Sequence, residues 1–141
     1  KCDTNNKTSL SKLKSSVFRL NELLNHDIFS EEFISFGGME LLMSIIRNFN
    51  DIRHRNIQSY SLNALCKLSL FMNGLEYIAR NHSIIRMLFS FIANKQNVIV
   101  VRGALYIMRI IAEYLPNSFT TINDAALEST EFDDYQQYKA K

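Results

Sequence analysis

Residues 98–116 read VIVVRGALYIMRIIAEYLP, and this stretch decides the fold class. The apolar side chains of one face recur at steps of three and four residues: Val101, Leu105, Met108 and Ala112. That spacing is typical of one side of an α-helix. Pro116, the only proline in the chain, cannot continue a helix. We therefore expect a helix over residues 98–115 whose Val101–Ala112 face packs in the core.

A neighbouring face of the same helix carries Tyr106, Ile110 and Glu113 at spacings of four and three. We expect this second face to be exposed and to contact a partner, with Ile110 as the apolar contact and Glu113 as its charged rim. An aspartate should then be tolerated at position 110 and should unfold the chain at position 105.

Helical periodicity continues outward from this stretch in both directions. It predicts helices over residues 10–25, 56–72, 75–80 and 84–93, and from Asn117 or Ser118 to about Glu128. Asn48–Arg55 is polar and irregular, which predicts a loop, and Asn73-Gly74 predicts a break after the 56–72 helix.

Two short helices are expected between residues 30 and 48. Ser30 is a candidate N-cap for the first, with Phe33, Ile34 and Phe36 on its buried side. Gly37-Gly38 predicts its end, because glycine readily takes the left-handed conformation of a helix stop. The second helix places four residues on one face: Leu41, Leu42, Ile45 and Ile46.

Two short helices followed by one long helix occur twice in succession. The stretch 33–38 corresponds to 77–83 about 44 residues later, and Ala64-Leu65 corresponds to Ala104-Leu105 about 40 residues later. A period of about 40–47 residues with three helices is typical of armadillo repeats, with HEAT-type helical pairs as the alternative. We expect an all-α, armadillo-type right-handed superhelix whose long third helices line a concave binding surface. Its predicted domains are an N-terminal extension (1–9), the repeat segment (10–128) and a polar tail (129–141).

Composition favours a protein-binding role over chemistry. The 141 residues are 47% apolar and 21% charged with a net charge of +2, which is typical of a globular chain without a basic stripe for nucleic acid. No apolar run reaches the roughly 18 residues of a membrane span. The two cysteines and three histidines lack metal-ligand spacing, and no nucleophile or phosphate-loop motif occurs. We expect no enzyme activity, no metal and no cofactor, in a cytoplasmic segment of a longer protein.

The run Leu62–Gly74, LNALCKLSLFMNG, resembles the GTPase-binding and FH3 region of diaphanous-related formins, whose corresponding helix ends in Met-Asn-Asn. Met72-Asn73, Leu105–Met108 and Pro116 stand at matching places, and the resemblance covers about residues 10–128. It implies binding of an active Rho-family GTPase near Met72 and Asn73. It also implies an intramolecular autoregulatory helix that keeps actin assembly switched off, so that actin is reached only indirectly, through the parent protein, and the segment is associated with the cytoskeleton.

Some residues depart from the formin pattern. Gly74 replaces the second Asn, while Ile110 and Glu113 stand where the family prefers a small and an apolar residue, which affects the autoregulatory helix more than the GTPase. The repeat alignment predicts a mostly apolar groove: Phe18, Glu22, Cys66, Leu70, Tyr106 and Ile110. Such a wall suits an amphipathic helix. The alternative is therefore an armadillo adaptor of the ELMO type that binds a helical peptide, whereas a nuclear import receptor would need Trp and Asn in its groove.

Overall fold

The computed structural model describes residues 2–118 of the chain, and these residues form helices and turns with no strand. The all-α fold class predicted from the sequence is confirmed. The chain divides into two compact units, residues 1–68 and 69–141. Within the described part, none of the helices combines the length and the apolar character that crossing a membrane requires.

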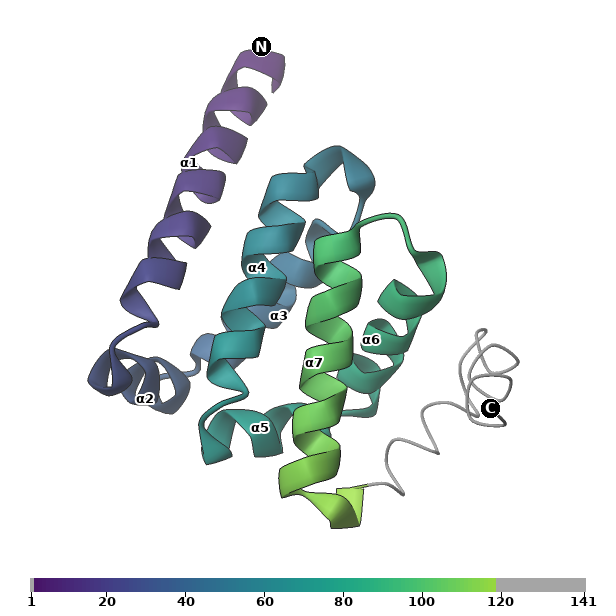
Figure 1. Cartoon of the computed structure of the whole chain (residues 1–141). Coiled ribbons are helices and arrows are strands. Elements are labelled where there is room, and N and C mark those ends of the chain that lie inside the picture. The colour runs from purple at the N-terminus through teal and green to yellow at the C-terminus, as the bar shows by residue number, and fades with distance from the viewer. Residues whose placement is uncertain (1, 119–141) are drawn as a thin grey trace. The chain divides into compact units, whose positions relative to one another are not determined.

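The first unit contains four α-helices and one 3₁₀-helix: α1 (Cys2–Leu23), α2 (Asp27–Ser35), α3 (Gly38–Asn48), η1 (Ile52–His54) and α4 (Arg55–Leu68). The long helix α4 packs against both α1 and α3, and α1 runs alongside it in Figure 1. Apolar side chains of α3 and α4 form the core of the unit, including Leu42, Met43, Ile46, Leu62 and Leu65. Burial of these side chains is the main source of stability for such short helices.

The second unit contains α5 (Met72–Ala79), α6 (His82–Asn94), α7 (Val98–Tyr114) and the 3₁₀-helix η2 (Pro116–Ser118), and its three α-helices repeat the order of α2, α3 and α4. The side chain of Asn97 caps α7 by accepting a hydrogen bond from the Ile99 amide at 3.2 Å. The buried apolar residues of the unit come from all three α-helices: Leu75, Ile78, Ile84, Ile85, Leu88, Ala104, Ile107 and Ile111.

The predicted pattern of two short helices and one long helix is confirmed in both units, and α7 ends within a residue of the predicted position. The first helix begins at Cys2 rather than at residue 10. Residues 7–9 are exposed, so no apolar periodicity marks these first turns. The predicted helix up to Glu128 and the tail 129–141 lie outside the described residues, except that η2 covers the start of the former.

The predicted start of α2 was wrong. His26 is the N-cap, and Ser30 lies inside the helix, fully buried, with its Oγ donating to the Leu24 carbonyl at 2.9 Å. The serine therefore ties α2 to the preceding turn instead of starting the helix. Phe36 follows the last helical residue and is 86% exposed, so its predicted burial was also wrong.

The two glycines that follow α2 are required for different structural reasons. Gly37 has a φ of +86°, the left-handed conformation that was predicted for the helix stop. Gly38 is the first residue of α3, and a Cβ at this position would overlap the ring of Phe33. In α3 the buried face is Met39, Leu42, Met43 and Ile46, whereas Leu41 is exposed. The predicted buried face was therefore displaced around the helix. Apolar residues occur there in adjacent pairs, so their spacing does not show which member of each pair points into the core.

The boundary between α4 and α5 also differs from the prediction. The helix expected over 56–72 ends at Leu68, and Met72 begins α5, so Asn73-Gly74 lies in the first turn of a helix rather than at a break. Gly74 is buried there. A glycine-containing pair was interpreted as a helix stop, but the chain instead turns at Ser69–Phe71, which carries no glycine or proline.

Candidate interaction surfaces

The short connection from α4 to α5 presents an exposed patch of mixed chemistry. Ser69 is buried, whereas Leu70 is 62% exposed, Met72 is 52% exposed and Asn73 is exposed. We call Leu70, Met72 and Asn73 the α5 patch. Because Met72 and Asn73 lie in the first turn of α5, their backbone amides have no intrahelical acceptor. Two apolar side chains, a carboxamide and free amide donors make a small contact surface for another protein.

Cys66 was also predicted to contact a partner, and it lies on α4 in the first unit. Burial raises the pKa of its thiol to about 12, so the side chain stays protonated at neutral pH. It can therefore act as a small apolar surface rather than as a nucleophile. Among the described residues, no group of three or more His, Cys, Asp or Glu is arranged to hold a metal ion.

The assignment of faces on α7 was wrong. Ile110, predicted to be exposed, is 7% exposed, and Leu105, predicted to be core, is 46% exposed. The buried side of the helix is Val100, Ala104, Ile107, Ile110 and Ile111. Because apolar residues occupy most of this helix, periodicity alone cannot show which side packs, and the predicted core face was displaced by one residue. Ile110 therefore offers no exposed contact.

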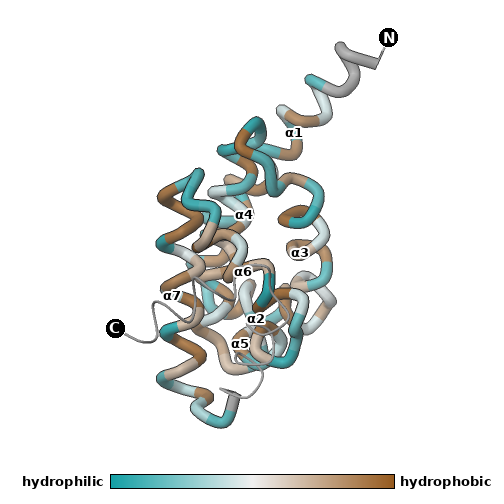
Figure 2. Tube along the Cα trace, turned by 90° about the vertical axis from the view of Figure 1, so that its right-hand side faces the viewer, coloured by the Kyte–Doolittle hydropathy of each residue, from teal (hydrophilic) through white to brown (hydrophobic). Residues whose placement is uncertain are grey.

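A neighbouring side of α7, about one residue (roughly 100°) round the helix from the buried side, carries a partly exposed apolar stripe. Val98 and Leu105 are exposed. Val101, which lies between them along the helix, and Met108, three residues after Leu105, are half-buried. We call these four residues the α7 stripe. In Figure 2, α7 shows apolar segments interrupted by polar ones along its whole length.

Two further predicted contacts lie on α7. Tyr106 is half-buried, and the Arg109 guanidinium lies over its ring, 5.4 Å from the centroid, while Glu113 is exposed. Their roles in binding stay predictions.

The first unit contains the other two predicted groove residues. Phe18 is half exposed and packs edge-on against Tyr60 with ring centroids 5.4 Å apart, and Glu22 is exposed. Beside them, Asn21 joins α1 to α4. Its Nδ2 donates to the Tyr60 carbonyl at 2.8 Å, and its Oδ1 accepts from Asn63 Nδ2 at 2.8 Å. Lys67 Nζ also donates to the Asn21 carbonyl at 2.6 Å. These three hydrogen bonds join α1 to α4.

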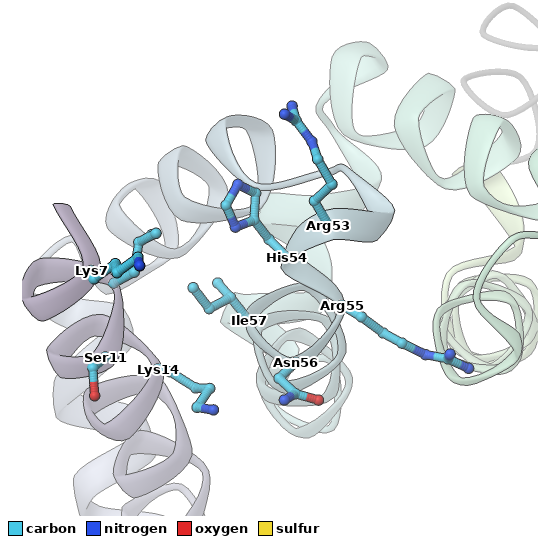
Figure 3. A pocket seen from close by; sticks show the side chains of 9 residues that line it. Lys7, Ser11, Lys14, Arg53, His54, Arg55, Asn56 and Ile57 are labelled. Atoms are coloured by element: carbon cyan, nitrogen blue, oxygen red, sulfur yellow. The ribbon is translucent and has the colours of Figure 1, made fainter. Parts of the chain in front are cut away.

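Sequence reasoning missed a pocket of about 380 Å³ in the first unit, between the N-terminal half of α1 and the start of α4. Figure 3 shows it from close by. It is lined by Lys7, Leu10, Ser11, Lys14, Arg53, His54, Arg55, Asn56 and Ile57. Two signals were present in the sequence: the run Arg53-His54-Arg55, and two lysines seven residues apart, which is about two helical turns. Neither signal indicates by itself that the two segments meet.

Comparison with known proteins places these surfaces in context. The family model described as the FHOD1/3 FH3 domain matches residues 55–140, more than half of the chain. Formin-G of Dictyostelium discoideum is 29% identical over 102 residues, which cover 72% of this chain and 9% of that protein. The chain thus spans about a tenth of the length of this relative.

Proposed function

Because this chain belongs to the FH3 domain family of FHOD1/3-type formins, we propose that it binds an active Rho-family GTPase and contributes to autoinhibition and to the control of actin filament assembly. It is a regulatory region of a formin, and its family consists of protein-interaction domains rather than enzymes. In this proposal the segment acts in the cytoplasm at the cytoskeleton, and it reaches actin only through the parent protein.

The α5 patch is the observation that best supports GTPase binding. Leu70 and Met72 expose apolar surface beside the Asn73 carboxamide at the start of a helix. Exposed apolar side chains next to hydrogen-bonding groups are typical of the centre of a protein interface. There, exclusion of water increases the contribution of each hydrogen bond to the binding free energy. The resemblance of Met72-Asn73 to the formin motif points to the same residues.

The proposal is tested by titrating the chain with Rho-family proteins loaded with GTP or GDP. We expect binding of the GTP form only. Asn73→Asp should weaken it about 10- to 100-fold, because losing a hydrogen bond to a charged partner costs about 1.5–3 kcal/mol. Asn25→Asp, at an exposed turn of the first unit, makes the same chemical change away from the patch and should leave affinity unchanged. Equal effects of the two variants would remove Asn73 from the interface, and absence of binding to every Rho-family protein would remove the proposal.

The α7 stripe supports a second candidate function, the binding of an amphipathic helix, either the autoregulatory helix of the parent formin or a helical peptide bound by an adaptor. Val98 and Leu105 expose apolar side chains on the same side of α7. An amphipathic helix recognises such a row through anchors at matching spacing. Leu105→Asp should then abolish capture of the helix and leave GTPase binding intact. Loss of GTPase binding in the same variant would show that the two surfaces are not separate.

A further inference from the structure

The pocket between α1 and α4 differs from the interaction surfaces above in its charge. Five of its nine lining residues are lysine, arginine or histidine, and none is acidic. The whole chain has a net charge of only +2, so this concentration of one sign is local. Positive side chains gathered around one hollow repel each other, and a bound anion relieves that repulsion.

The side chains differ in how available their charge is. Arg53 donates from Nε and Nη2 to Asp51 Oδ2 at 3.1 and 2.9 Å, and this contact holds the pKa of that carboxyl below its usual value. Its charge is thus compensated by a carboxylate outside the lining. Lys7, Lys14 and Arg55 form no ion pair with any other residue among positions 7–117.

Figure 3 shows how these groups are placed. Lys14 extends from α1 into the space in front of α4, Lys7 lies further along α1 on the same side, and the His54 imidazole faces them from η1. The His54 ring is held edge-on against Phe49, with centroids 5.1 Å apart. Ile57, which is buried, forms the apolar floor between the two elements. Arg55 lines the pocket, but its side chain points away from Lys7 and Lys14.

We infer that this pocket binds a small ligand that carries two or more phosphate groups. The two ammonium groups on α1 and the imidazole on η1 can each donate a hydrogen bond to a phosphate oxygen. A single carboxylate has too few oxygens to engage all of these donors fully. A volume of about 380 Å³ accommodates a compact phosphorylated polyol but is too small for a folded partner. The pocket belongs to a different unit from the α5 patch and the α7 stripe, so the inference does not depend on the proposed function.

The test is calorimetric titration of the whole chain with inositol 1,4,5-trisphosphate at about 0.15 M salt, where non-specific attraction is largely screened. We expect saturable binding at one site. Lys7→Gln/Lys14→Gln should weaken it at least tenfold. The matched control Lys12→Gln/Arg19→Gln removes two exposed charges from the same helix outside the pocket and should change affinity less than threefold.

Additional probes distinguish the possible sources of the phosphate groups. Vesicles that contain phosphatidylinositol 4,5-bisphosphate should bind with the same dependence on Lys7 and Lys14 if the natural ligand is a lipid headgroup, and only the soluble trisphosphate should bind if it is a free metabolite. Asn56→Asp places a carboxylate in the lining and should abolish binding in both cases.

Three results would overturn the inference. These are no binding of the trisphosphate at millimolar concentration, equal loss in the pocket and control variants, or binding of single-stranded nucleic acid or an acidic peptide through Lys7 and Lys14 without binding of the trisphosphate. Thermal melting of each variant establishes that the fold is retained.

Discussion

Helices α4 and α7 are the last α-helices of their units, and each follows two shorter helices, yet they bury corresponding residues differently. Ala64 and Ala104 are both fully buried, but Leu65 is fully buried while Leu105 is 46% exposed. The same contrast holds along one side of each helix, where four residues of α4 have counterparts 40 positions later in α7. The α4 side is buried and consists of Gln58, Ser61, Leu65 and Leu68. The α7 side is exposed or half-buried and consists of Val98, Val101, Leu105 and Met108.

The less apolar of the two sets is the better buried one. In α4 this side includes a glutamine and a serine, whereas in α7 every member is apolar. Burial in the described structure does not explain the apolar character of the α7 side. A row of exposed apolar side chains on a helix is the usual sign of a surface that another polypeptide covers. In the described residues, this side of α4 is therefore used for folding, whereas the corresponding side of α7 is left partly exposed.

The largest expected effect comes from placing the same charge at the two aligned leucines. Leu65→Asp forces an unpaired carboxylate into the core and should cost more than about 5 kcal/mol, enough to unfold a typical domain. Leu105→Asp should cost about 1–2 kcal/mol, because the side chain is partly in water. Ile110→Asp should resemble Leu65→Asp, the reverse of what the sequence predicted. Thermal melting followed by circular dichroism measures all three.

If Leu105→Asp unfolds the chain as completely as Leu65→Asp, then the two helices are equivalent and the contrast between them is lost. Leu105→Gln, which adds no charge, provides the matched control for the effect of removing the leucine.

A smaller effect is expected where α4 is joined to α1. Asn21→Ala leaves the Tyr60 carbonyl and the Asn63 amide without this partner, and the loss should cost about 1–3 kcal/mol. Urea denaturation gives this change in the free energy of unfolding. Asn25→Ala, on the exposed turn after α1, is the control and should change it by less than about 0.5 kcal/mol. If Asn21→Ala and Asn25→Ala lowered the free energy of unfolding equally, the hydrogen bonds of Asn21 would make no specific contribution to stability.

The smallest effect concerns Ser61, whose counterpart in α7 is Val101. Ser61 Oγ is fully buried and has no hydrogen-bond partner among the described residues. Ser61→Ala removes this unsatisfied hydroxyl and adds helix propensity, so it should stabilise the chain by about 1 kcal/mol. Ser9→Ala, at an exposed site on α1, should give only the propensity contribution of about 0.5 kcal/mol. A loss of stability in Ser61→Ala would show that the hydroxyl has a partner.

Sequence periodicity predicted the helical class, the order of short and long helices and the end of α7 before Pro116, because these depend on spacing within one segment. It did not predict which side of α7 is buried, since Leu105 and Ile110 are equally apolar and only the packing of other helices distinguishes them. It placed Met72-Asn73 at the end of a helix, although these residues begin one, because the turn at Ser69–Phe71 has no turn residues. The pocket at Lys7 and Lys14 depends on two segments that lie far apart in the sequence.

We propose that this formin FH3 segment recognises an active Rho-family GTPase through exposed residues that follow α4, and not through α4 itself. Amide hydrogen exchange of the chain, with and without the GTP-loaded GTPase, tests it most directly. The first amides of α5 lack intrahelical acceptors and should exchange rapidly in the free chain. The account predicts slower exchange over residues 69–75 in the complex and unchanged exchange over residues 62–68. A GTPase that binds while residues 69–75 remain unchanged would contradict it.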